Sequence, residues 1–129
     1  MAPAYKQIFI VVIDDNQKGL EFLYTALTRP GVEVLAASTP EDGLALVDLY
    51  KPQIVMTDLV MPGMDGLEVL RKVRQMNPAI DVIVTSAEES GGSRTDAIKQ
   101  GAADYLTKPT PLSVLRECVG KLIQKHVSE

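Results

Sequence analysis

The chain has 129 residues, 46% of them hydrophobic, so it is long enough for one domain with a sizeable core. The net charge is −4 and no basic run marks a nucleic-acid surface, so we expect no direct binding to DNA or RNA. A lone cysteine, Cys118, excludes an internal disulfide, and no apolar stretch approaches the ~20 residues of a membrane span. Residues 1–7 lack the pattern of a secretion signal, so we expect a cytoplasmic protein without a membrane partner.

Strands and helices are predicted to alternate along the chain. Residues 8–13 (IFIVVI) are apolar without a break, which is typical of a strand buried on both faces. Helical spacing assigns Tyr24 and Leu112 to the apolar stripes of the first and last helices. The further predicted strands are 32–37, 54–57, 82–86 and 104–107, and the predicted helices are 17–28, 40 to about 50, roughly 66–75, one from a cap at Ser93 or Asp96 to Gly101, and one that Thr110 and Pro111 open.

This alternation predicts an α/β fold with one doubly wound sheet of five parallel strands and helices on both faces. Parallel strands joined by helices cross over right-handed, and the order that we expect is the flavodoxin-like 2-1-3-4-5. We find no repeat, low-complexity tract or linker in the sequence. The chain is therefore expected to be a single domain over residues 1–129, with its core at about 8–126 and without an effector domain.

Charged residues follow three of the predicted strands. Asp14 and Asp15 come directly after the first strand, Asp58 follows the third, and Lys108 follows the fifth. Because the loops at the carboxyl ends of parallel strands meet in one crevice, we expect these four side chains to converge. Three carboxylates and one ammonium group suit a divalent cation and a phosphoryl group.

Four motifs carry a resemblance to a known family. They are IDDN at 13–16, TDLVMPGMDG at 57–66, TSA at 85–87 and GAADYLTKP at 101–109. In this order, and at the ends of predicted strands, they resemble the receiver domain of two-component response regulators, from Ile8 to about His126. The resemblance implies a signalling switch rather than an enzyme, in which a histidine kinase or a phosphotransfer protein passes a phosphoryl group to Asp58.

The resemblance also implies a bound Mg²⁺ ion, for which Mn²⁺ can substitute. Asp15, Asp58 and the backbone carbonyl of Val60 are the implied ligands, and Asp14 acts indirectly or through water. A cation is needed because three close carboxylates repel one another and the incoming phosphate. Lys108 is implied to contact a phosphoryl oxygen, and the peptide bond between Lys108 and Pro109 is implied to be cis.

A conformational switch follows from the same resemblance. Ser86 is implied to bond a phosphoryl oxygen; Thr85 is the other hydroxyl candidate, but neighbouring strand residues face opposite ways. Tyr105 would then turn inward and change the surface of the fourth helix, fifth strand and fifth helix. That surface would control an effector protein, a tethered output domain or a phosphorylation-dependent homodimer. Val60 and Glu88 are implied to tune dephosphorylation.

Two other interpretations of the sequence stay open. A degenerate receiver would act only as an interaction module, although the acids and the lysine of the motifs are all present. A phosphatase of the haloacid-dehalogenase type would also form an aspartyl phosphate, but it needs an acid two residues after its nucleophile, where Val60 or Asn16 stands here. A helix-capping role for Asp14 and a core-packing role for Tyr105 also remain as alternatives.

Overall fold

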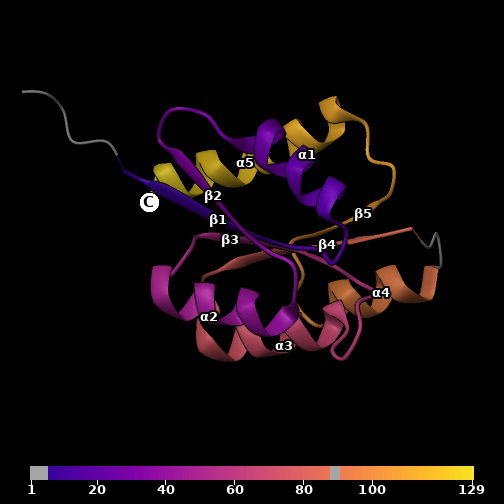
Figure 1. Ribbon diagram of the computed structural model, residues 1–129. Coiled ribbons are helices and arrows are strands. Elements are labelled where there is room, and N and C mark those ends of the chain that lie inside the picture. The colour runs from indigo at the N-terminus through magenta and orange to yellow at the C-terminus, as the bar shows by residue number, and fades with distance from the viewer. Residues whose placement is uncertain (1–5, 88–90) are drawn as a thin grey trace, which may run out of the picture.

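The computed structural model of the chain describes residues 6–87 and 91–129. Strands and helices alternate in these ranges, as the sequence predicts (Figure 1). No helix in the described ranges is long and apolar enough to cross a membrane. The strands are β1 (Ile8–Ile13), β2 (Val32–Ala37), β3 (Ile54–Asp58), β4 (Asp81–Ser86) and β5 (Asp104–Thr107), and the helices are α1 (Gln17–Leu27), α2 (Pro40–Tyr50), α3 (Gly66–Met76), α4 (Gly91–Lys99) and α5 (Leu112–Val127).

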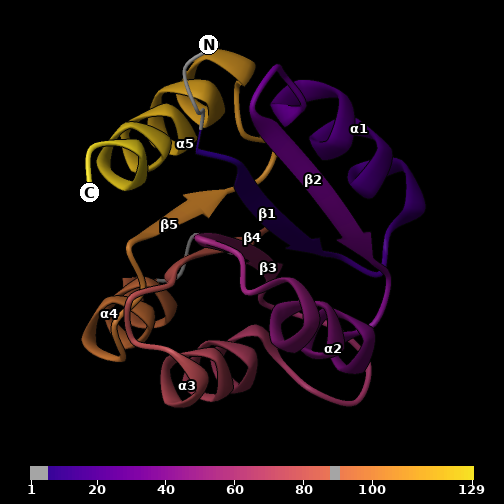
Figure 2. The same ribbon diagram turned by 90° about the vertical axis from the view of Figure 1, so that its left-hand side faces the viewer.

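These five strands form one parallel sheet in the order β2-β1-β3-β4-β5, which confirms the predicted topology. Helices α1 and α5 cover one face of the sheet, and α2, α3 and α4 cover the other (Figure 2). The chain turns to one side of β1 to form β2 and to the other side to form β3. The loops after β1 and β3 therefore lie side by side at the carboxyl end of the sheet, where α/β proteins bind ligands.

Successive residues of β1 pack on opposite faces of the sheet. Val11 and Ile13 belong to the apolar cluster shared with α2, α3 and α4, whereas Ile10 and Val12 belong to the cluster shared with α1 and α5. All four side chains are at most 1% exposed. Strand β1 is thus buried on both faces, as its unbroken apolar run predicts.

Side chains cap the first three helices. Asn16, Thr39 and Asp65 each accept a hydrogen bond from the backbone N–H three residues later. Such bonds satisfy N–H groups that have no partner inside the helix. Because Asn16 caps α1, the carboxylate of Asp14 is left to make other contacts.

Two helix ends differ from the predicted ones. Helix α4 begins at Gly91, so Ser93 lies in its first turn rather than at its cap. The first N–H groups of a helix have no partner inside the helix, and groups other than the predicted capping side chain can bond them. The helix can therefore begin before the residue that the sequence suggests as its cap. Helix α1 ends one residue early because Thr28 is extended and its hydroxyl donates to the carbonyl oxygen of Tyr24 at 2.6 Å.

Two residues of the predicted apolar stripes lie outside the core. Tyr24 is 51% exposed and Leu112 is 38% exposed. In α1 the fully buried residues are Leu20 and Leu27, which lie two turns apart on one line along the helix. The ring of Tyr24 lies at the margin of this narrow stripe, and Leu112 is the first residue of α5, before its buried positions begin.

Helix α5 also carries the single cysteine and the single histidine. Burial and the neighbouring Asp104 raise the pKa of the Cys118 thiol to about 12, so the thiol stays protonated and unreactive. His126 is 3% exposed, and its Nε2 lies 2.7 Å from Oδ2 of Asp81. That contact ties the end of α5 to the start of β4.

Candidate functional site

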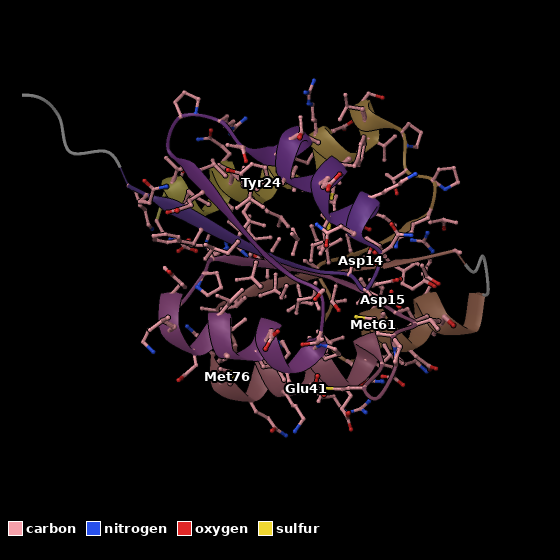
Figure 3. The ribbon with its side chains drawn as sticks, viewed as in Figure 1. Asp14, Asp15, Tyr24, Glu41, Met61 and Met76 are labelled. Atoms are coloured by element: carbon pink, nitrogen blue, oxygen red, sulfur yellow. The ribbon has the colours of Figure 1, made fainter. Side chains whose placement is uncertain are left out.

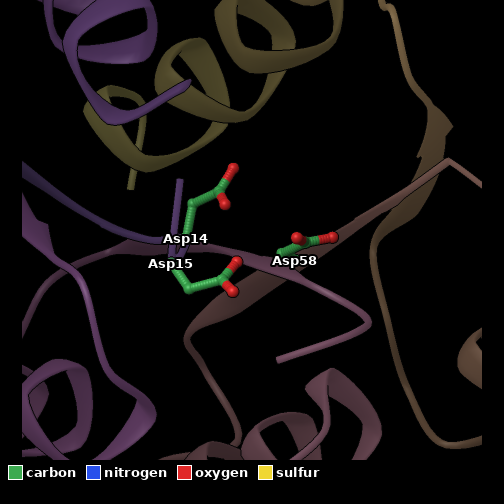
Figure 4. A group of neighbouring side chains, drawn as sticks. All are labelled: Asp14, Asp15 and Asp58. Atoms are coloured by element: carbon green, nitrogen blue, oxygen red, sulfur yellow. The ribbon is translucent and has the colours of Figure 1, made fainter. Parts of the chain in front are cut away.

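Three aspartates gather at the carboxyl end of the sheet. Asp14 and Asp15 follow β1, Asp58 is the last residue of β3, and one carboxylate oxygen of each lies within 4.8 Å of the others (Figure 4). Figure 3 shows Asp14 and Asp15 at the same end of the molecule as Met61, which belongs to the loop after β3. Asp14 is buried, Asp58 is partly buried and Asp15 is exposed. The carboxylates that the sequence predicts to converge are thus found together.

Lys108 bridges two of these carboxylates. Its Nζ lies 2.8 Å from Oδ2 of Asp14 and 3.3 Å from Oδ2 of Asp58. The backbone N–H of Lys108 donates to the carbonyl oxygen of Ser86 at 2.7 Å, which holds the loop after β5 against the end of β4. The Lys108–Pro109 peptide bond is cis, the isomer that the resemblance implies.

Both oxygens of the Asp14 carboxylate have a hydrogen-bond partner. The backbone N–H of Asn16 donates to Oδ1 at 2.9 Å, and Lys108 donates to Oδ2. The first bond closes a turn that an aspartate makes with the residue two positions later. These two bonds keep a carboxylate that is only 2% exposed in one orientation.

The mutual interactions of the site change the pKa values of two groups. Burial raises the pKa of Asp58 above its ordinary value of 3.8; Lys108 opposes this change, and Asp14 adds to it. Burial alone would lower the pKa of Lys108, but its bonds and charge interactions with Asp14 and Asp58 outweigh burial and raise it above 10.5. Lys108 is therefore a cation at neutral pH, and it contacts two of the three carboxylates.

A glycine lets the loop after Asp58 return to the end of β3. The N–H of Gly66 donates to the carbonyl oxygen of Leu59 at 2.7 Å, and the N–H of Leu59 donates to that of Thr85 at the same distance. A Cβ at position 66 would collide with the carbonyl oxygen of Asp58. The close approach of α3 to the site therefore requires glycine.

The two hydroxyl residues at the end of β4 lie on opposite faces of the sheet. Ile83 packs with α1 and α5, whereas Val84 packs with α2, α3 and α4. By strand alternation, Thr85 continues the first face and Ser86 the second. Thr85 accordingly lines a cleft of about 810 Å³ between α1 and the start of α5, which Asp14 also lines. Ser86 is 1% exposed.

Tyr105 is 1% exposed, in the apolar cluster that α2, α3 and α4 share with the sheet. The guanidinium carbon of Arg94 in α4 lies 5.1 Å from the centre of its ring, a cation–π geometry. The ring of Tyr105 is therefore already inward in this structure, and the two positions that the resemblance implies are not both seen.

The structure describes only one of the two residues that are expected to tune dephosphorylation. Val60 is 63% exposed in the loop directly after β3, two residues beyond Asp58. Glu88 lies outside the described residues. The tuning role of both residues stays a prediction.

The donor set of the site fits a hard divalent cation. The oxygen atoms close enough together to surround an ion come from the carboxylates of Asp14, Asp15 and Asp58, and Mg²⁺ prefers oxygen ligands over nitrogen or sulfur. Burial and the neighbouring Asp14 raise the pKa of Asp58, because together they disfavour its charged form more than Lys108 favours it. A cation among these oxygens would remove that imbalance.

Sequence reasoning missed the residues that fix the orientation of Asp14. The N–H of Asn16 bonds its carboxylate, and Gly19 passes directly beside it. The aspartate-to-asparagine spacing of two residues was a visible signal for the first contact. The close approach of Gly19 depends on the path of α1 over the end of β1, which cannot be predicted from a single sequence.

Comparison with known proteins shows the family. A family model for the response regulator receiver domain matches residues 10–120. The chain is 34% identical to the KDP operon transcriptional regulatory protein KdpE of Escherichia coli, over 91% of this chain and 52% of that protein. It is 32% identical to Protein PilH of Pseudomonas aeruginosa, over 88% of this chain and 96% of that protein.

Solved structures agree with this assignment. A response regulator receiver domain protein from Clostridium thermocellum has a TM-score of 0.85 and 30% identity, over 92% of this chain and 96% of that chain. The chain therefore belongs to the response regulator receiver domains of two-component signalling systems. Receiver domains are signalling switches and are generally not classed as enzymes. This chain spans about half the length of KdpE and nearly all of PilH.

Proposed function

We propose that Asp58 accepts a phosphoryl group from a histidine kinase or a histidine phosphotransfer protein. The observation that supports this most directly is the position of Lys108, whose Nζ lies between Asp58 at 3.3 Å and the buried Asp14 at 2.8 Å. A carboxylate at the end of a central strand, partly exposed and beside a fixed ammonium group, is placed to react with an anionic phosphorus centre.

The reaction follows from the chemistry of the two groups. An oxygen of the ionised Asp58 carboxylate attacks the phosphorus of a phosphohistidine, and a new O–P bond forms while the N–P bond breaks. The electron pair of the N–P bond stays on the imidazole nitrogen, which takes up a proton. Lys108 donates a hydrogen bond to an oxygen of the transferred group and offsets its charge.

Asp15, Asp58 and the backbone carbonyl of Val60 would hold Mg²⁺, or Mn²⁺ in its place, with Asp14 acting indirectly. When bound, the ion neutralises charge on the transferring phosphoryl group. The residues of this chain orient the reacting atoms: Asn16 and Lys108 fix Asp14, and the bond from Gly66 to Leu59 closes the loop that carries Val60.

Phosphorylation would act on the rest of the domain through Ser86 and Tyr105. The Ser86 hydroxyl would donate to a phosphoryl oxygen, which draws the end of β4 toward Asp58. Tyr105 pairs with Val84 of β4 and contacts Arg94 of α4, so a movement of β4 would be felt by α4. We infer that the surface formed by α4, β5 and α5 changes and controls an effector protein, a tethered output domain or a homodimer.

The lifetime of the phosphorylated state would depend on access of water to the phosphoryl group. Val60 is exposed two residues after Asp58, and its side chain offers no hydrogen bond to water. With Glu88, it would tune the rate of dephosphorylation.

A small-molecule phosphodonor tests this function. With Mg²⁺, the wild-type protein should take up one phosphate that is stable in acid and labile in base, and Asp58→Asn should take up none while remaining folded. Hydrolysis of the donor without accumulation of phosphorylated protein would instead indicate a phosphatase, and neither uptake nor hydrolysis would indicate a degenerate receiver.

A further inference from the structure

Gly19 passes closer to the Asp14 carboxylate than any residue with a side chain could. A Cβ at position 19 would lie 2.9 Å from Oδ2 of Asp14 and 3.6 Å from its Cγ. A separation of 2.9 Å is well inside the usual contact distance between a carbon and an oxygen atom. A side chain at position 19 would therefore force the Asp14 carboxylate or the first turn of α1 to shift.

Two hydrogen bonds hold the Asp14 carboxylate in place against such a side chain. Its Oδ1 accepts the N–H of Asn16 at 2.9 Å, and its Oδ2, the atom that faces Gly19, accepts Lys108 at 2.8 Å. Rotation of the carboxylate would break one of these bonds in an environment where Asp14 is 2% exposed.

Helix α1 is equally unable to move aside. The N–H of Gly19 donates to Oδ1 of Asn16 at 2.9 Å, and the next residue, Leu20, is 4% exposed in the core. A side chain at position 19 would thus act on the carboxylate itself, and through Oδ2 on the Lys108 ammonium that also contacts Asp58.

We propose that Gly19 is a positioning residue of the site: the missing side chain lets Asp14 hold Lys108 beside Asp58 and keeps the three carboxylates arranged for a divalent cation. This inference rests on the proposed function, because it gives Gly19 its role through the metal and phosphoryl site. Glycine has a lower helix propensity than alanine, so glycine at position 19, in the first turn of α1, lowers the stability of the helix.

Gly120 provides a matched control in α5. It is also a helical glycine, but a Cβ at position 120 would meet nothing within 4 Å. Gly120→Ala should therefore raise the unfolding temperature slightly through helix propensity and leave Mg²⁺ binding unchanged. Gly19→Ala makes the same chemical change at a position where the new methyl group meets Oδ2 of Asp14.

The test is a double-mutant cycle of Gly19→Ala and Asp14→Ala, with Mg²⁺ binding measured by calorimetry. Gly19→Ala alone should weaken Mg²⁺ binding about tenfold or more, as changes to residues that orient metal ligands do. In the Asp14→Ala background the carboxylate is gone, so Gly19→Ala should have no further effect on Mg²⁺ affinity. Wild-type affinity in Gly19→Ala, or equal losses in both backgrounds, would overturn the inference.

Thermal unfolding without metal gives an independent readout. Gly19→Ala should lower the unfolding temperature when Asp14 is present and raise it when Asp14 is alanine, because only helix propensity then remains. If Gly19→Ala alone does not fold, the double variant should regain the fold, and its failure to do so would contradict the inference. If wild-type protein binds no Mg²⁺, the proposed function fails, whereas this change of sign still tests the contact.

Discussion

The ammonium group of Lys108 holds two carboxylates from different strands, at 2.8 Å from Asp14 and 3.3 Å from Asp58. Asp14 is buried and Asp58 is partly buried, so each depends on this cation more than a surface carboxylate would. Lys108 itself is one-third exposed, so solvent weakens the pairs to some degree. The balance of charge in the site therefore differs between the metal-free and the metal-bound protein.

Removal of Lys108 should destabilise the metal-free protein. We expect Lys108→Met to lower the free energy of unfolding by about 1–3 kcal/mol, because Asp14 loses a hydrogen-bond partner in a buried position. Mg²⁺ should recover part of the loss by neutralising the same carboxylates. Urea unfolding with and without Mg²⁺ measures both effects.

Lys121→Met is the control for that change. Lys121 is 75% exposed in side chain and pairs with Glu117 one turn away on α5. Its removal should change the free energy of unfolding by no more than about 0.5 kcal/mol. Equal effects of the two substitutions, or no recovery with Mg²⁺, would show that Lys108 does not balance the aspartates.

The raised pKa of Asp58 predicts how stability depends on pH. A carboxyl group that binds its proton more tightly in the folded state makes folding less favourable as the pH rises above 3.8, its ordinary pKa. Without metal, Asp58→Asn should therefore be more stable than wild type at neutral pH, and this advantage should shrink as the pH falls toward 3.8. Parallel stability profiles of the two proteins from acid to neutral pH would contradict this.

Asp15 is the exposed member of the cluster and the expected direct ligand of the ion. Asp15→Ala should weaken Mg²⁺ binding by more than about tenfold. A tenfold loss is the smallest usual effect of removing a residue that only orients a ligand, and Asp15 is expected to be a ligand itself. The substitution should also make the metal-free protein slightly more stable, since it removes repulsion from Asp14 and Asp58. Asp48→Ala, which removes one exposed charge from α2, is the control. Calorimetry that finds the same Mg²⁺ affinity in both variants would exclude Asp15 as a ligand.

Ser86 should be needed for the response to phosphate rather than for its uptake. Ser86→Ala should still bind the phosphoryl mimic beryllofluoride, because Asp58 and Lys108 are unchanged. The mimic should change the rate of amide hydrogen exchange in α4 and β5 of the wild type. It should not do so in Ser86→Ala, because the phosphoryl oxygen loses its hydroxyl partner. The coupling is refuted if residues 91–107 exchange alike with and without the mimic, or if the variant responds as the wild type does.

The fold and the position of the site could be read from the sequence because both depend on local patterns. The unbroken apolar run of β1 predicts a strand buried on both faces, and Asp14, Asp15 and Asp58 stand where such strands end. Once the strands are parallel, their carboxyl ends must meet. The approach of Lys108 to this cluster follows from the same geometry.

Contacts that depend on exact packing could not be predicted. His126 bonds Asp81, which is 45 positions away in sequence, and no local sequence pattern predicts this pair. The closeness of Gly19 to Asp14 depends on the angle at which α1 crosses the end of β1. The position of Tyr105 depends on how β5 and α4 pack, with Arg94 over its ring, so an inward ring was not expected before phosphorylation.

The central claim is that the phosphoryl group is carried by Asp58. Borohydride reduces an acyl phosphate to an alcohol, so the phosphorylated aspartate becomes homoserine, which peptide mass spectrometry can locate. After phosphorylation with Mg²⁺ and a small phosphodonor, we expect homoserine at position 58 in the wild type and none at Asp14, Asp15 or Asp65. Homoserine at any of these other positions, or phosphate that survives in Asp58→Asn, would contradict the account.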